Sequence, residues 1–158
     1  MYKTFADLRA KRARGENGFT LIELLVVVVI LGVLIAIAIP VYLNYRKGAN
    51  DAAAESDVRN AVSVMEVCYA GVGKYPTAAT TYPTTTANTP CAGQAVTVSS
   101  GTTLKYVANT AGTAGTCYTI WGTNSGGAPK YWIYNSSTGG SVAESTSALY
   151  AAAAAPTC

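Results

Sequence analysis

Histidine is absent from this sequence of 158 residues, and charged residues make up only 12% of it. Catalysis by an imidazole is therefore excluded, and a zinc site is disfavoured because its ligands commonly include histidine. The sequence also has no phosphate-binding glycine motif, and beyond Glu66 it has a single acidic residue, Glu144. These absences argue against an enzyme and predict neither a metal nor another cofactor.

The net charge of +3 is confined to the first 18 residues, which hold five bases and two acids. Residues 19–158 hold six residues of each sign and are net neutral. A neutral surface gives no electrostatic support to nucleic-acid binding and favours self-association over solubility.

A long apolar segment follows the basic start, with Glu23 as the one charged residue between Phe19 and Ile39. A helix of this length covers about 30 Å, the hydrocarbon thickness of a bilayer. The segment has no polar stripe, which predicts a position in lipid or inside an assembly. More positive charge precedes it than the Arg46 and Lys47 that follow it, so we expect a cytoplasmic N-terminus and an exported remainder.

The exported part is expected to be α+β. An amphipathic helix is predicted from Ala49 to about Tyr69, with one apolar face of Val58, Val62, Met65 and Tyr69. Residues 74–94, rich in proline and threonine, are expected to be a loop. Strands are predicted at 95–99, 104–108, 117–122 and 130–134, the last two forming a hairpin through residues 124–127. The expected fold is a long N-terminal helix packed on a small antiparallel sheet. The tail, residues 148–158, reads as a short helix or coil.

Four cysteines, Cys68, Cys91, Cys117 and Cys158, lie beyond the apolar segment. An even number of widely spaced cysteines behind a membrane-type segment predicts two disulfides in an oxidising compartment. Spacing alone leaves all three connectivities open.

The run Gly18-Phe19-Thr20-Leu21-Ile22-Glu23, followed by the apolar segment with Gly32 and Pro40, resembles the type IV prepilin cleavage and methylation signature. The resemblance covers about residues 15–60. It implies a leader at 1–18 that is removed, a transmembrane and filament-core helix at 19–47, and a globular pilin head at 48–158.

By the same resemblance, a prepilin peptidase cuts between Gly18 and Phe19 on the cytoplasmic side and methylates the new amine of Phe19. Glu23 then pairs with the Phe19 amine of a neighbouring subunit. The stretch from Gly32 to Pro40 loses helicity on assembly or forms a kink that aims the head. We expect Cys68–Cys91, which would tie the helix end to the threonine-rich loop, and Cys117–Cys158, which would tie the hairpin to the tail. The resemblance implies the second pair, because pilins often link their C-terminal region in this way.

The partners implied are further copies of the chain in a helical homopolymer, a prepilin peptidase, a membrane assembly platform, an assembly ATPase and, before assembly, membrane lipid. The product would be a fimbrium on the cell surface. The resemblance leaves open whether the fibre serves adhesion, twitching motility, DNA uptake or secretion.

The physics of Glu23 supports a special role. A carboxylate within a bilayer costs about 2.5–3.5 kcal/mol at the centre and less near an end. It also needs a partner once it is buried in a dry fibre. A second interpretation is that Glu23 complements the positive end of its own helix, worth about 0.3–1 kcal/mol.

Other classes of protein fit part of the pattern. A secretory signal cleaved at Ala36-x-Ala38 conflicts with Glu23 in its apolar core. A single-pass protein that never assembles leaves the leader motif unexplained. A pseudopilin of a type II secretion or competence system is the close alternative, although Glu144, the one acid beyond Glu66, is too few for the calcium site that major pseudopilins carry. The Thr77–Thr89 loop and the sequon at Asn135 are candidate glycosylation sites.

Overall fold

The computed structural model describes residues 19–78, 80–82, 87–88, 95–108 and 113–146. The chain divides into two compact units, Met1–Tyr42 and Leu43–Cys158, and each is described by itself. Helix α2 (Leu21–Val72) contributes its first half to the first unit and its second half to the second unit.

Helix α2 forms over 52 residues, with Pro40 inside it, and ends before Gly73. Gly73 takes a positive φ of 75°, and its N–H donates to the carbonyl of Tyr69 at 2.7 Å. Glycine adopts this left-handed conformation without steric cost, which explains why the helix stops there. The helix thus ends three residues beyond the predicted end near Tyr69.

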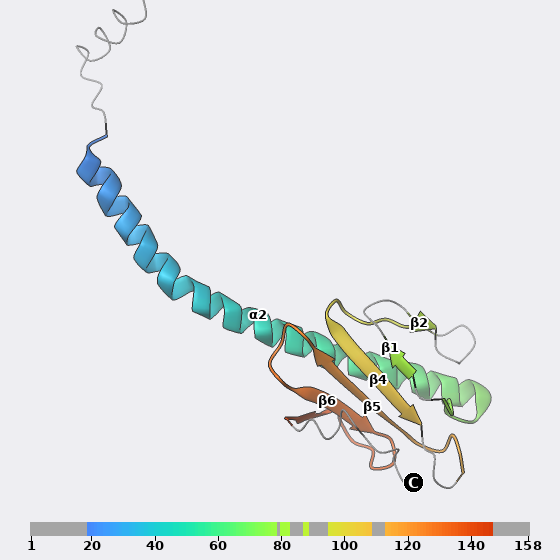
Figure 1. The fold of residues 1–158 in the computed structure, drawn as a ribbon. Helices are drawn as coiled ribbons and strands as arrows, with labels where there is room; N and C mark the ends of the chain where they lie inside the picture. Colours follow the sequence, from blue (N-terminus) through green and yellow to red (C-terminus); the bar gives the residue numbers. More distant parts are fainter. Residues whose placement is uncertain (1–18, 79, 83–86, 89–94, 109–112, 147–158) are drawn as a thin grey trace, which may run out of the picture. The chain divides into compact units, whose positions relative to one another are not determined.

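The second unit contains a five-stranded antiparallel sheet in the order β1-β4-β5-β6-β7 (Figure 1). Its strands are β1 (Thr80–Tyr82), β4 (Thr102–Ala108), β5 (Tyr118–Asn124), β6 (Tyr131–Asn135) and β7 (Ala143–Ser145). A separate pair joins β2 (Ala87–Asn88) to β3 (Ala95–Val96). The α+β prediction of a helix on a small antiparallel sheet is confirmed.

The predicted hairpin is present: β5 pairs with β6 from Thr119↔Asn135 to Gly122↔Trp132. The prediction of an unbroken loop at 74–94 is wrong, because β1 and β2 lie within it. Strand β1 is at the edge of its sheet, where only one side is paired. Threonine suits such a strand, so the proline-rich composition excluded a central strand but not an edge strand.

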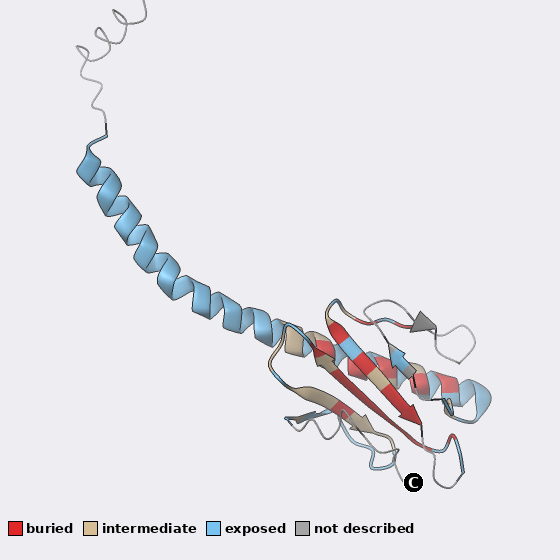
Figure 2. Cartoon of the chain, viewed as in Figure 1, coloured by how far each residue is buried: buried red, intermediate tan, exposed pale blue. Residues whose placement is uncertain are grey.

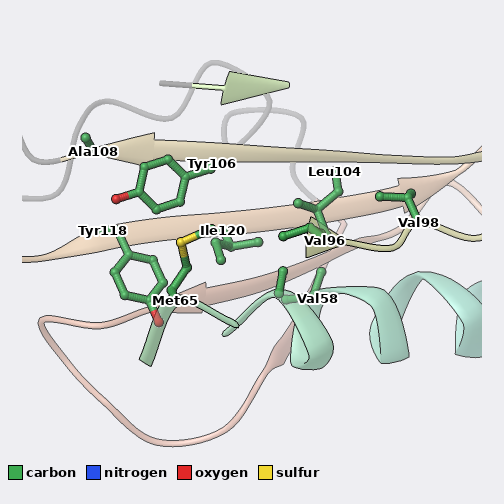
Figure 3. Close-up of a cluster of buried hydrophobic side chains, with 10 residues drawn as sticks. Val58, Met65, Val96, Val98, Leu104, Tyr106, Ala108, Tyr118 and Ile120 are labelled. Carbon is green, nitrogen blue, oxygen red and sulfur yellow. The ribbon is translucent and has the colours of Figure 1, made fainter. Parts of the chain in front are cut away.

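The core lies between the second half of α2 and the inner face of the sheet (Figures 2 and 3). Val58 and Met65 of the helix are fully buried, as are Leu104 of β4 and Ile120 of β5. Each element thereby removes the other's apolar face from water, the main driving force for folding the head.

The buried face of α2 includes the predicted Val58 and Met65, and Val62 packs against the core, but the prediction is wrong at Tyr69. The buried face consists of Ala54, Asp57, Val58, Ala61, Met65 and Cys68. Tyr69 instead remains 44% exposed. Small residues line the contact because the sheet approaches closely: a Cβ added at Gly122 of β5 would lie 2.8 Å from Cγ2 of Val58. Size, and not only hydrophobicity, therefore selects the packed face.

Candidate functional site: an exposed apolar helix with one acid

The first half of α2 is an unpaired apolar surface. Every large apolar side chain from Leu21 to Tyr45 is exposed, from 47% at Leu43 to 82% at Leu21 (Figure 2). This part of the helix is also long and apolar enough to cross a membrane. A surface of this kind needs lipid or other protein around it, since contiguous apolar area in water is costly.

Glu23 caps the N-terminus of this helix. Its Oε2 accepts hydrogen bonds from the backbone N–H and the hydroxyl of Thr20, both at 2.8 Å. In return, the N–H of Glu23 donates to the Thr20 hydroxyl at 3.3 Å. This reciprocal pattern is a capping box, and the sequence Thr20-x-x-Glu23 is its signature. Glu23 therefore does stabilise the N-terminus of its own helix, as the second interpretation predicted, through the contacts of Oε2 with Thr20.

One carboxylate oxygen of Glu23 is left over. Among the described residues, Oε1 has no hydrogen-bond donor, whereas Oε2 has two. A shallow groove beside this carboxylate is lined by Phe19, Ile22, Val26 and Val27. An apolar groove with one free carboxylate oxygen can accept a positively charged, apolar group such as an N-terminal phenylalanine.

Phe19 is the first described residue, and its side chain is 91% exposed. Phe19 and Thr20 precede the first helical residue, Leu21. The other half of the predicted cleavage site, Gly18, lies outside the described residues. The predicted roles of Gly18 and Phe19 therefore stay predictions.

Gly32 and Pro40 both lie within continuous helix, so neither interrupts α2 in this state. A Cβ added at Gly32 would meet no atom within 4 Å, which shows that close packing does not require glycine there. Glycine lowers helix stability by about 1 kcal/mol relative to alanine, and proline removes one helical hydrogen bond. The predicted weak stretch between them stays a prediction.

Both cysteines that the structure describes, Cys68 at the buried face of α2 and Cys117 before β5, are disulfide-bonded. The other two, Cys91 and Cys158, lie outside the described residues. The predicted pairs, Cys68–Cys91 and Cys117–Cys158, therefore stay predictions.

A cluster around Glu66 was not predicted. Its carboxylate accepts hydrogen bonds from the hydroxyls of Tyr75, at 3.0 and 3.2 Å, and Tyr118, at 2.9 Å. Their rings pack edge-on with centroids 4.6 Å apart. Burial, followed by the hydrogen bond to Glu66, raises the pKa of Tyr75 to about 12. The same causes raise the pKa of Tyr118 above its ordinary range.

The Glu66 cluster joins residues that are far apart in the sequence, and no local motif marks it. By contrast, the Thr20–Glu23 cap has a four-residue signature that the sequence displays directly. Within the described ranges, no group of three or more cysteine, aspartate or glutamate side chains forms a metal-binding arrangement.

A family model matches a segment that includes the start of this helix. Residues 13–39 match the family described as the prokaryotic N-terminal methylation motif. The chain is 44% identical over 54 residues to the type IV wide pilus major component of Thermus thermophilus, covering 34% of this chain and 41% of that protein. It is 43% identical over 53 residues to the type IV major fimbrial protein of Dichelobacter nodosus, covering 34% of each chain.

A third relative is the type II secretion system core protein G of Dickeya chrysanthemi, 36% identical over 64 residues, or 40% of this chain and 42% of that protein. The chain thus spans less than half the length of each of these three relatives. The family match at residues 13–39 includes the Thr20–Glu23 cap and most of the exposed apolar surface. The chain thus carries the prokaryotic N-terminal methylation motif at residues 13–39 and is similar, over part of its length, to type IV pilus components and to a type II secretion core protein.

Proposed function

We propose that this chain is a structural subunit of a type IV pilus, held in the membrane by the first half of α2 and then assembled through it. The observation that carries the proposal is the apolar surface from Leu21 to Tyr45, which no described part of the chain covers. A helix bundle of identical copies would bury this surface, as the lipid does before assembly. Relatives named as major pilus and fimbrial components support this role.

Glu23 supplies specificity in this proposal. Removal of residues 1–18 creates a positive amine on Phe19, one helical turn from the Glu23 of the same chain. In the filament, the free Oε1 of Glu23 pairs with the Phe19 amine of a neighbouring copy, while Oε2 keeps its cap on Thr20. An uncompensated charge in an apolar fibre is strongly destabilising, so misaligned copies are rejected.

Processing follows from the same segment. A prepilin peptidase cuts after Gly18 on the cytoplasmic side and methylates Phe19, and an assembly platform with its ATPase extracts the subunit from the membrane. The head, from residue 48 onward, then lies on the surface of the extracellular fibre. The stretch between Gly32 and Pro40 either loses helicity on assembly or forms a kink that aims the head. The role is structural and not enzymatic.

A second candidate function is a pseudopilin of a type II secretion system, favoured by the likeness to core protein G. Both functions use the same helix. They differ in what the assembled subunits do: one forms a surface fibre, and the other supports protein secretion. A gene deletion strain, examined by electron microscopy and assayed for motility, transformation and protein secretion, separates them. Loss of surface fibres supports the pilus; loss of secretion with normal fibres would support the pseudopilin instead.

The proposal itself is tested by N-terminal sequencing and mass spectrometry of the protein purified from its cells. A pilin begins at methylated Phe19, whereas a conventionally secreted domain would begin near Ile39. A chain that retains residues 1–18 and never enters fibres would show that the segment is only a membrane anchor.

A further inference from the structure

A basic turn of α2 marks the start of the second unit. Tyr45, Arg46 and Lys47 are consecutive and exposed, with Tyr45 at 77%. We call these three residues the basic turn. Tyr45 is the last residue of the apolar surface, and Arg46 and Lys47 follow it directly in the sequence. No acidic residue lies between Glu23 and Asp51.

The two cations of the basic turn have no acidic partner among the described residues. The ion pairs of that part of the chain are Arg59–Glu55 and Lys130–Glu144, the latter at 3.0 Å. The acid closest to Lys47 on the helix is Asp51, four residues on, where a surface pair would be expected. Its Oδ1 instead accepts a hydrogen bond from the N–H of Ala128 at 2.9 Å, in the turn between β5 and β6.

Every acidic side chain of the second unit already has a partner. Asp57 accepts from Ser99, and Glu66 accepts from Tyr75 and Tyr118. The remaining three carboxylates are those bound by Arg59, Lys130 and the Ala128 amide. None of these five described carboxylates forms an ion pair with Arg46 or Lys47, so the charge of both cations is available to an anion outside the chain.

We propose that the basic turn binds the phosphates of anionic phospholipids at the membrane surface on the side of the head. This inference rests on the proposed membrane-held state of the subunit. Arg46 and Lys47 match the charge of these headgroups, since basic residues beside a membrane span are attracted to anionic lipid. Tyr45 adds an amphipathic ring, the side-chain type that concentrates at the membrane–water interface. The turn sets how deeply the helix sits and keeps the head at the surface until assembly.

The test uses the full chain, purified in a non-ionic detergent. Phosphatidylglycerol or phosphatidylcholine with identical acyl chains is titrated in, and bound lipids are counted by native mass spectrometry. We expect the chain to prefer phosphatidylglycerol, and each of Arg46→Gln and Lys47→Gln to weaken that binding by about fivefold. The matched control is Lys74→Gln, which removes one exposed cation elsewhere in the head and should leave the preference unchanged.

Three results would overturn the inference: equal binding of the two lipids, an equal loss in Lys74→Gln, or full displacement of the lipid by inorganic phosphate, which would indicate a general anion site. The same spectra report whether the chain forms a dimer. If the Arg46→Gln, Lys47→Gln double variant lost such a dimer but kept its lipid preference, the basic turn would contact a second copy of the chain and not lipid. Unchanged fluorescence of Trp121 and Trp132 confirms that each variant is folded.

Failure of this inference is distinguishable from failure of the proposed function. The same variants are examined in cells for an N-terminus at Phe19 and for fibres. Fibres without a lipid preference would contradict the lipid site alone. A lipid preference in a chain that is never processed would contradict the pilus alone.

Discussion

The carboxylate of Asp57 binds both the backbone N–H and the hydroxyl of Ser99, at 2.8 and 2.9 Å, across 42 residues of sequence. Asp57 lies on the buried face of α2 and is only 4% exposed, and Ser99 precedes β4. A buried charge is tolerated when its oxygens are hydrogen-bonded, and here two bonds join the helix to the loop that enters the sheet.

Asp57→Ala should therefore destabilise the head. The change leaves the Ser99 N–H without its partner in a partly buried place, which costs about 2 kcal/mol. The free energy of unfolding is measured by denaturant titration of the full chain in detergent, with tryptophan fluorescence as the signal. Glu55→Ala is the matched control on the same helix; because its pair with Arg59 is largely exposed, it should cost less than about 1 kcal/mol. An equal loss in both variants would contradict the argument.

Gly122→Ala should destabilise the head through overpacking. The added Cβ would lie 2.8 Å from Cγ2 of Val58 and 3.4 Å from the carbonyl oxygen of Ala54. Such overpacking costs about 1–3 kcal/mol, measured by the same denaturant titration. Gly48→Ala is the control, because nothing lies within 4 Å of its added Cβ, and it should be neutral or stabilising by up to about 1 kcal/mol. Val58→Ala combined with Gly122→Ala should recover part of the loss; if it does not, Val58 is not the obstacle.

The Glu66 cluster predicts a loss of stability at alkaline pH. The pKa of Tyr75 in the folded head is about 12, above its ordinary value of 10, so the folded state holds this proton more tightly than the unfolded state. The resulting stabilisation is complete below about pH 10 and is lost as pH rises towards 12. Absorbance at the tyrosinate band, followed with denaturant titrations across this range, measures both effects.

Glu66→Gln should lower the pKa of Tyr75 and Tyr118 only in part, because burial is the larger cause of each shift and remains. Tyr42→Phe is the control, since it removes a tyrosine that is 64% exposed in the other unit. If Glu66→Gln left the tyrosine titration unchanged, the negative charge of Glu66 would not contribute to the raised pKa.

Substitutions at Glu23 separate its cap from its proposed pair. Glu23→Ala should leave the precursor stable and processed but prevent its incorporation into fibres. Glu23→Gln keeps a side chain that can complete the capping box but cannot pair with an amine as an ion, so it should also fail to assemble. Thr20→Ala removes the cap and keeps the carboxylate, so it should still assemble. The amount of fibre made by each variant is measured by electron microscopy and by recovery of sheared fibres. A normal amount from Glu23→Gln would show that assembly needs only the cap.

Gly18→Arg should leave the precursor uncleaved. A protease binds its substrate extended, and glycine at this position keeps the helix from extending back across the cut. On immunoblots, this variant should run as a band that is larger than the processed protein by the mass of residues 1–18. Gly15→Ala lies in the same leader, away from the cut, and should be processed normally. Full processing of Gly18→Arg would place the cut elsewhere.

How much the sequence could predict depended on the range of the interaction. The capping box and the membrane-length segment are local, so their signals lie within consecutive residues. The edge strand β1 and the partners of Glu66 depend on segments tens of residues away, which is why composition suggested a plain loop and gave no sign of the cluster.

The sequence by itself determined the membrane-length helix, its single acid at Glu23 and the positions of Gly18 and Phe19, because each is set by local composition and spacing. Only the tertiary structure decided that Asp57 is buried, that Tyr69 is not, and that no carboxylate of the described residues forms an ion pair with Arg46 or Lys47. The physical reason is that burial and pairing are properties of two surfaces in contact. A helix carries several candidate faces, and the shape of the sheet, here the close approach at Gly122, selects among them.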